Sequence, residues 1–115
     1  MVVEDNDLNR KLFCDVLKAN GFEVEPVADG NVVLETARAT APDLIIMDIQ
    51  LGGVSGVDLI EAAKRDRRLS GIPVLAVTAF AAKGDEERIR AAGAEGYLSK
   101  PVSIGPFMTA VKALV

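Results

Sequence analysis

The chain has 115 residues, the size of one domain, and half of them are hydrophobic, which is enough for a substantial core. Its net charge of −4, from 17 acidic and 13 basic residues, argues against a nucleic-acid-binding protein, which needs a basic stripe. With no histidine and one cysteine, Cys14, the composition excludes histidine-based triads, zinc sites with histidine ligands, cysteine-based metal sites and disulfide frameworks.

The first half of the chain alternates between strand-like and helix-like segments. Residues 1–5 begin as a short apolar strand, and residues 8–21 have the spacing of an amphipathic helix. The apolar stripe expected on that helix consists of Leu8, Leu12, Phe13, Val16 and Leu17. Cys14 lies off this stripe, so we expect it to be partly exposed. Asn6 or Asp7 is expected to cap the helix, and Gly21 to end it in a left-handed turn.

The same alternation continues to the end of the chain. The expected elements are a strand over 22–27, a helix over 31–41, a buried strand over 43–48, a Gly-rich loop over 51–56, a helix over 57–68, a strand over 73–78, a helix over 85–94, a strand over 96–99 and a helix over 103–115. Asp85 is the candidate cap of the fourth helix and Gly93 its stop. Five strands and five helices in alternation predict an α/β domain with a parallel sheet covered by helices on both faces.

Polar or ionisable residues stand at the ends of the apolar strands. They are Glu4 and Asp5, Asp48, Thr78 and Lys100. Taken singly, such a residue is often a turn residue or a helix cap. Taken together they predict a functional site, because the carboxyl ends of parallel strands meet at one edge of the sheet.

These residue types suit phosphoryl transfer. Neighbouring carboxylates repel one another unless a proton or a cation joins them, and Mg²⁺ binds one or two carboxylates with waters and a phosphate. Thr78 offers a hydroxyl group and Lys100 a mobile positive charge for an anion. Asp48 would then be the nucleophile that forms an acyl phosphate.

Four stretches of the sequence carry a resemblance to a known family. "VVEDN", "DLIIMDIQ", "PVLAVTA" and "YLSKP", in this order and spacing, resemble the receiver domain of two-component response regulators. The resemblance spans essentially the whole chain, so we expect one receiver domain over residues 1–115. It implies a flavodoxin-like, doubly wound, five-stranded parallel sheet with strand order 2-1-3-4-5 and five helices.

The resemblance also implies a role for each site residue. Asp48 would be the phosphoacceptor, and Thr78 and Lys100 would hold the phosphoryl oxygens. Mg²⁺, or Mn²⁺ as a substitute, would be held by Asp5, Asp48, the backbone carbonyl of Gln50 and, through a water, Glu4. Tyr97 matches the switch aromatic that responds to Thr78. The Lys100–Pro101 peptide bond is commonly cis in the family.

The sequence departs from the family pattern in two places. Gly52-Gly53 stands where family members usually have proline after the residue that corresponds to Leu51. The family also has several more residues before "VVED", so only Met1, Val2 and Val3 are left for a first strand, which we expect to be short.

The resemblance implies protein partners and a phosphoacceptor signalling domain rather than an enzyme, with only self-phosphorylation from small donors and autodephosphorylation expected. The donor would be an external histidine kinase or histidine phosphotransfer protein, since the chain has no histidine. The signal would pass to a downstream protein, and no nucleic acid or membrane insertion would be involved. The protein would be cytoplasmic and a monomer or a weak dimer. Residues 76–103 resemble the single-domain cell-division regulators of the family, which suggests cell-cycle control. Receivers of hybrid histidine kinases and of longer response regulators carry similar sequences, and this alternative stays open.

Three other classes of protein are weighed against the receiver. An aspartyl-nucleophile phosphatase resembles D-x-D-x-T, but "DIQLG" lacks the second aspartate. A flavodoxin needs a phosphate-binding loop after the first strand, where this chain has the acidic "EDND". A pseudo-receiver would have lost one of Asp48, Thr78 and Lys100.

Two hypotheses concern the surroundings of the site. Phe80, two residues after Thr78, is expected to limit water access and slow the loss of phosphate. Arg10 and Cys14 are candidates for the kinase-docking face on the first helix, by analogy with the family.

Overall fold

The computed structural model describes residues 1–79 and 84–115 and shows one parallel sheet with the strand order β2-β1-β3-β6-β7. The strands of this sheet are β1 (Val2–Val3), β2 (Pro26–Val27), β3 (Ile45–Asp48), β6 (Val74–Thr78) and β7 (Gly96–Ser99). Numbered along the chain as first to fifth, they lie in the order 2-1-3-4-5. The predicted doubly wound parallel sheet is therefore confirmed.

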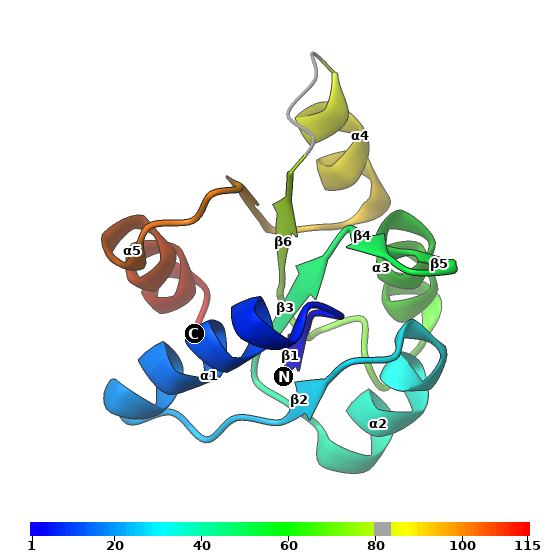
Figure 1. The fold of residues 1–115 in the computed structure, drawn as a ribbon. Helices are drawn as coiled ribbons and strands as arrows, with labels where there is room; N and C mark the ends of the chain where they lie inside the picture. Colours follow the sequence, from blue (N-terminus) through cyan, green and yellow to red (C-terminus); the bar gives the residue numbers. More distant parts are fainter. Residues whose placement is uncertain (80–83) are drawn as a thin grey trace.

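Helices cover both faces of the sheet (Figure 1). On one face lie α1 (Asp7–Ala19) and α5 (Ile104–Leu114). On the other face lie α2 (Val33–Thr40), α3 (Gly56–Arg65) and α4 (Asp85–Ala92), with a 3₁₀ turn, η1 (Gly30–Val32), leading into α2. None of the helices in the described ranges is long and apolar enough to cross a membrane.

Strand side chains alternate between two separate cores. Val3 and Met47 pack under α2, α3 and α4, whereas Val2 and Ile46 pack under α1 and α5. On the second face the rings of Phe13 and Phe107 stack with their centroids 5.0 Å apart and tie α1 to α5. Burial on both faces explains why the strands read as continuous apolar runs, as the sequence of β3 indicated.

β1 is short but lies in the middle of the sheet. Val2 and Val3 pair with Pro26 and Val27 of β2 on one side and with β3 on the other. Both valines are buried, with exposed fractions of 0% and 1%. The predicted short first strand is confirmed, and the chain turns from it directly into the Glu4–Asp5 pair.

Several local predictions are confirmed at the helix ends. The backbone N–H of Asn9 donates to Asn6 Oδ1 at 2.9 Å, so Asn6 is the N-cap of α1. Gly21 and Gly93 follow α1 and α4 with positive φ angles of 88° and 123°. The cap predicted for α4 is wrong, because Gly84 holds that position and Asp85 is the first helical residue, where its charge still suits the helix N-terminus.

The helical stripe predicted for α1 is partly wrong. Leu8 and Leu12 are 75% and 46% exposed, whereas Cys14 is buried at 6%. The helix is rotated so that Phe13, Cys14 and Leu17 face the sheet. Cys14 is therefore a core residue and not part of an exposed docking face.

Other boundaries also differ from the sequence analysis, most clearly in three places. The strand predicted over 22–27 is reduced to Pro26–Val27. Phe22 and Val24 still pack on the core, but they lie outside the hydrogen-bonded strand. The loop predicted over 51–56 contains a hairpin of β4 (Gln50–Leu51) and β5 (Val54–Ser55), joined by the two glycines. The helix predicted over 57–68 ends at Arg65.

Gly56 sets the distance between the start of α3 and the end of β3. Its N–H donates to the Ile49 carbonyl at 3.1 Å. A Cβ atom at this position would lie 2.6 Å from Ile49 Cα and 2.8 Å from the Asp48 carbonyl oxygen. Both neighbours are backbone atoms, so a side chain here would displace the strand end that carries Asp48.

We predict that Gly56→Ala lowers the free energy of unfolding by about 3 kcal/mol, since relief of the overlap requires a backbone shift. Gly71→Ala is the matched control, because a Cβ atom at Gly71 meets no atom within 4 Å. Urea unfolding of the three proteins measures the difference. Equal stability of the two variants would contradict the close approach of α3.

Candidate functional site

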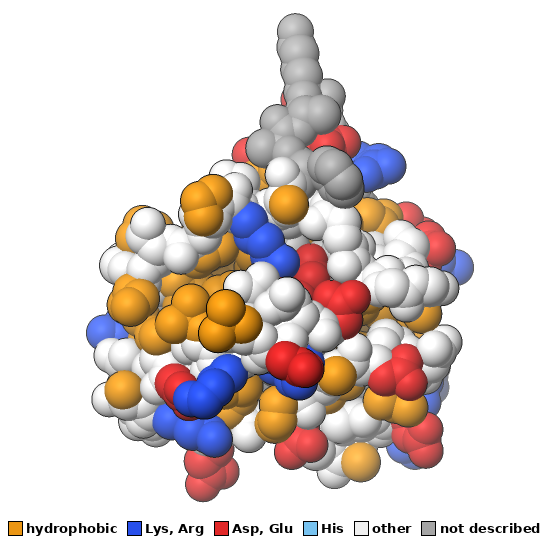
Figure 2. All heavy atoms as spheres, viewed as in Figure 1, with side chains coloured by type: hydrophobic (Ala, Val, Ile, Leu, Met, Phe, Trp, Pro, Cys, Tyr) orange, Lys and Arg blue, Asp and Glu red, His pale blue; other side chains and the backbone are white. Residues whose placement is uncertain are grey.

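Charged side chains from separate strands meet at the carboxyl edge of the sheet. Lys100, which follows β7, places its Nζ atom 2.8 Å from Glu4 Oε1 and 3.4 Å from Asp48 Oδ2. Glu4 and Asp48 are 1% and 3% exposed. Figure 2 shows acidic side chains beside a basic one near the middle of this view of the surface. The sheet thus joins residues 4, 48 and 100 in one buried ion cluster.

Three carboxylates form the acidic part of the site. Glu4, Asp5 and Asp48 each offer an oxygen, and these oxygens lie within 4.8 Å of one another. Asp5 is exposed and accepts a hydrogen bond from the Gly52 N–H at 3.0 Å. Glu4 Oε2 is buried and has no hydrogen-bond partner among the described residues. This oxygen-only donor set, with a buried oxygen left unpaired, fits a hard divalent cation such as Mg²⁺.

The pKa values of the two buried acids shift in opposite directions. Burial, together with the adjacent Glu4 carboxyl group, raises the pKa of Asp48 from 3.8 to about 7 against the opposing effects of the Gln50 N–H and Lys100. Burial also disfavours ionised Glu4, but hydrogen bonding with Asp48 and the Lys100 ammonium outweigh it and lower the pKa of Glu4. The pKa of Lys100 is raised, because the two acids overcome its own burial. Without a bound cation, Asp48 therefore keeps its proton to a much higher pH than an exposed aspartate does, and loses it around neutral pH.

Gln50, in β4, links the acidic cluster to the end of β6. Its backbone N–H donates to Asp48 Oδ1 at 3.1 Å. Its side-chain Nε2 donates to Thr78 Oγ1, and its Oε1 accepts from the Ala79 N–H at 3.0 Å. The sequence indicated only the Gln50 backbone carbonyl, because nothing in the sequence shows where the side chain of a polar loop residue points.

The remaining predicted residues occupy β6, β7 and the segment between them. Thr78 ends β6 and is 1% exposed, beside Asp48 on the neighbouring strand. Tyr97 is half-buried in β7, pairs in register with Ala76 and packs on the core under α2, α3 and α4. The Lys100–Pro101 bond is cis, as the family resemblance predicted. Phe80 lies outside the described residues.

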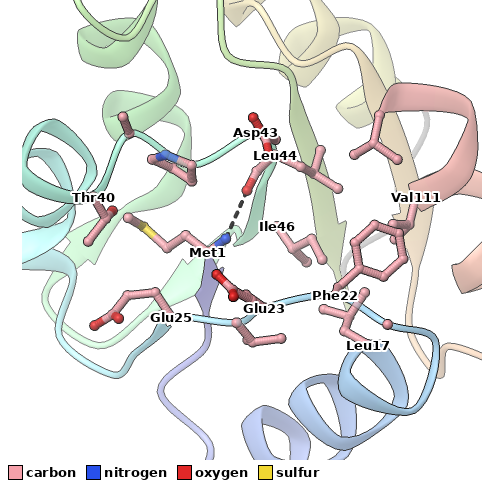
Figure 3. Close-up of a pocket in the computed structure, with 15 residues that line it drawn as sticks. Met1, Leu17, Phe22, Glu23, Glu25, Thr40, Asp43, Leu44, Ile46 and Val111 are labelled. Carbon is pink, nitrogen blue, oxygen red and sulfur yellow. Dashed lines mark hydrogen bonds between the residues drawn. The ribbon is translucent and has the colours of Figure 1, made fainter.

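A separate hollow of about 720 Å³ lies at the opposite end of the sheet (Figure 3). Its lining includes Phe22, Glu25 and Leu44, and the Met1 ammonium donates to the Leu44 carbonyl at 2.9 Å across it. Asp48, Thr78 and Lys100 are not part of its lining. The hollow is therefore distinct from the acidic cluster.

Comparison with protein families identifies the class of protein that this fold and site define. Residues 1–112 match the response regulator receiver domain, and the chain belongs to that family. It is 52% identical over 113 residues to the polar-differentiation response regulator DivK of Brucella ovis and, equally, of Brucella melitensis. Each match covers 98% of this chain and 92% of the relative. The predicted resemblance to response regulator receivers is confirmed.

Solved structures agree with the fold. The chemotaxis protein CheY4 of Vibrio cholerae has a TM-score of 0.92 at 25% identity, over 99% of this chain and 95% of its own. The receiver domain of the sensor histidine kinase PA1611 of Pseudomonas aeruginosa has a TM-score of 0.89 at 29% identity, over 98% and 93%. The second structure has a magnesium ion coordinated in its active-site cleft.

We predict that Asp48→Asn stabilises the metal-free protein at pH 8. The raised pKa of Asp48, about 7 against 3.8, means that the folded state keeps a proton that the unfolded state loses, so stability falls as pH rises through this range. At pH 8 the variant should exceed the unmodified protein by about 2–4 kcal/mol, and at pH 4 the difference should shrink. Urea unfolding in a chelator measures both, with exposed Glu23→Gln as the control. A pH-independent difference would contradict the buried proton.

Proposed function

We propose that this chain is a phosphoacceptor receiver domain in which Asp48 takes a phosphoryl group from a phosphohistidine. The observation that carries the proposal is the position of the Lys100 ammonium, 2.8 Å from Glu4 Oε1 and 3.4 Å from Asp48 Oδ2. A cation beside a buried carboxylate, with the Thr78 hydroxyl on the neighbouring strand end, provides what a phosphorylated aspartate requires. Membership in the receiver family supports the same assignment.

The transfer requires a donor protein. The chain has no histidine, so the phosphohistidine belongs to a histidine kinase or a histidine phosphotransfer protein outside these 115 residues. An Asp48 carboxylate oxygen attacks the phosphorus atom, the phosphorus–nitrogen bond breaks, and the donor's imidazole leaves. Lys100 and Thr78 hold the phosphoryl oxygens by an ion pair and a hydrogen bond. No turnover of phosphate esters is expected, since the chain is a signalling domain.

Mg²⁺ fits the acidic cluster, and Mn²⁺ is a chemically similar substitute. Asp5, Asp48 and the Gln50 backbone carbonyl would hold the ion, with Glu4 acting through a water. When bound, the ion neutralises charge on the carboxylates and on the incoming phosphoryl group. Glu4 supports this arrangement through Lys100, whose ammonium it holds close to Asp48.

Phosphorylation would switch a protein-binding surface. Thr78 would move toward the phosphoryl group, and Tyr97 would turn into the space beside it. Both side chains lie on neighbouring strands, β6 and β7, which supports their coupling. The surface that responds would consist of α4, β7 and α5, and it would bind a downstream protein.

Exposed apolar side chains support a protein donor near the site. Leu8 and Leu12 on α1 and Ile104 on α5 are 75%, 46% and 58% exposed. Both helices lie on the same face of the sheet, and they begin shortly after Glu4 and Lys100, the charged residues that follow β1 and β7. We propose this surface as the place where the kinase or phosphotransfer protein binds.

The proposal for the biological setting is supported by the relatives. Similarity to DivK, which is a polar-differentiation response regulator, supports a role in cell-cycle and cell-division control. We propose that residues 1–115 form a single receiver domain that acts in the cytoplasm as a monomer or a weak dimer and signals through protein contacts.

Incubation with acetyl phosphate and Mg²⁺ tests the proposed phosphoacceptor. Intact mass spectrometry should show one added phosphoryl group on the unmodified protein and none on Asp48→Asn. Exposed Asp15→Asn is the control and should react as the unmodified protein does. A phosphoryl group that persists on Asp48→Asn would place the acceptor elsewhere.

Removal of one proposed metal ligand tests the cation site. Mg²⁺ at about 100 times its dissociation constant should raise the free energy of unfolding of the unmodified protein by about 2.7 kcal/mol. Asp5→Asn should lose most of this gain, because it removes one of the few charged ligands. Urea unfolding with and without Mg²⁺ measures the gain, and an equal gain in Asp5→Asn would reject this ligand.

A further inference from the structure

The Gln50 side chain forms a bridge between two groups at the end of β6. Its Oε1 accepts a hydrogen bond from the Ala79 N–H at 3.0 Å, and its Nε2 donates to Thr78 Oγ1. The orientation of the carboxamide is fixed, because a backbone N–H only donates and must face the carbonyl oxygen. The backbone of the same glutamine is tied to Asp48 Oδ1 at 3.1 Å.

This bridge engages the Thr78 hydroxyl, which the proposed function assigns to the phosphoryl group, together with the neighbouring Ala79 N–H. Asp48 and Val77 are direct partners in the parallel ladder, so Thr78 and the Ala79 N–H follow at the same edge of the sheet. The Ala79 N–H has one hydrogen and serves one strong acceptor at a time. While Gln50 Oε1 accepts it, a phosphoryl oxygen does not.

The second half of the bridge opposes movement of Thr78. The Gln50 carboxamide donates to the Thr78 hydroxyl, and this hydrogen bond joins two elements, β4 and β6. Movement of Thr78 toward Asp48 breaks or redirects this hydrogen bond. Both hydrogen bonds of the Gln50 side chain therefore favour the unphosphorylated arrangement.

We propose that the Gln50 carboxamide is a latch that holds Thr78 and the Ala79 N–H in the unphosphorylated state and must release them when a phosphoryl group binds. This proposal rests on the proposed phosphoacceptor function and adds a positioning residue to it. Gln50 acts through Thr78 and Ala79 rather than by direct contact with the phosphoryl group. Its loss should strengthen the binding of phosphoryl mimics instead of weakening it.

The test uses beryllofluoride, formed from beryllium and fluoride ions, as a non-covalent mimic of the phosphoryl group. Gln50→Met keeps the length of the side chain and the backbone carbonyl but removes both hydrogen bonds. Loss of two hydrogen bonds that oppose binding, partly replaced by water, predicts about tenfold tighter beryllofluoride binding in the presence of Mg²⁺. Fluorine NMR titration of the full chain measures the dissociation constant.

Two controls separate the latch from a general effect of the substitution. Asn20→Met removes an amide hydrogen bond of similar kind, from Asn20 Nδ2 to the Val16 carbonyl at 2.8 Å, far from the site along α1. It should bind beryllofluoride as the unmodified protein does. In the ligand-free state, the ¹H–¹⁵N resonance of Ala79 should shift in Gln50→Met and stay in place in Asn20→Met. Gln50→Asn, whose side chain is too short to bridge, is the second variant should Gln50→Met fold poorly.

The outcomes distinguish the latch from the proposed function. Tighter binding in Gln50→Met with an unchanged Asn20→Met supports the latch. Equal affinity overturns the latch while leaving the phosphoacceptor intact, and weaker binding overturns it by making Gln50 a ligand of the phosphoryl group. Failure of the unmodified protein to bind beryllofluoride or to accept phosphate from acetyl phosphate overturns the proposed function, and the latch with it.

Discussion

The burial of two carboxylates beside one ammonium group is the constraint on which the rest of the site depends. Glu4 and Asp48 lie almost completely out of water, and Lys100 contacts both. Two acids so close cannot both ionise freely in a poorly hydrated place, so the pKa of Asp48 stays raised unless more positive charge arrives. The cluster is thus one positive charge short of full ionisation, which explains why a divalent cation fits it. A phosphoryl group adds negative charge to the same place and makes the need for cations greater.

The parallel sheet makes this cluster possible. Glu4, Asp48 and Lys100 are separated by dozens of residues, yet each lies at or directly after the carboxyl end of a strand at one edge of the sheet. The apolar cores on both faces of the sheet hold the strand ends in register. The charges are therefore brought together by the packing of the sheet, and their own attraction is not needed to drive folding. The apolar burial in the two cores stabilises the fold, whereas the burial of Glu4 and Asp48 at the edge opposes it.

The β4–β5 hairpin places one residue, Gln50, against both β3 and β6 at this edge. It positions Gln50 so that the backbone contacts Asp48 while the side chain reaches Thr78 and Ala79. One residue therefore touches both the acid that would be modified and the groups that would respond. Through this residue, a change of charge at Asp48 would be coupled to the end of β6, as a two-state element requires.

The sequence by itself determined the fold class and the set of polar strand ends. Continuous apolar runs such as residues 44–47, followed by Asp48, identify buried parallel strands, because only a strand covered on both faces lacks alternation. The motifs around Glu4, Asp48, Thr78 and Lys100 also sufficed to indicate the family, since they depend on residue identity and spacing alone. Helix caps at Asn6 and Gly93 were predictable for a similar reason, because capping is decided within a few residues.

Only the tertiary structure decided the features that depend on rotation and distance between elements. Periodicity did not show that α1 turns Cys14 inward and Leu8 outward, because several apolar stripes of that helix compete and the sheet selects one. The hairpin at Gly52-Gly53 and the close approach of Gly56 to the backbone of β3 depend on how α3 packs. The direction of the Gln50 side chain and the raised pKa of Asp48 follow from burial and from partners far away in the sequence, which no local pattern encodes.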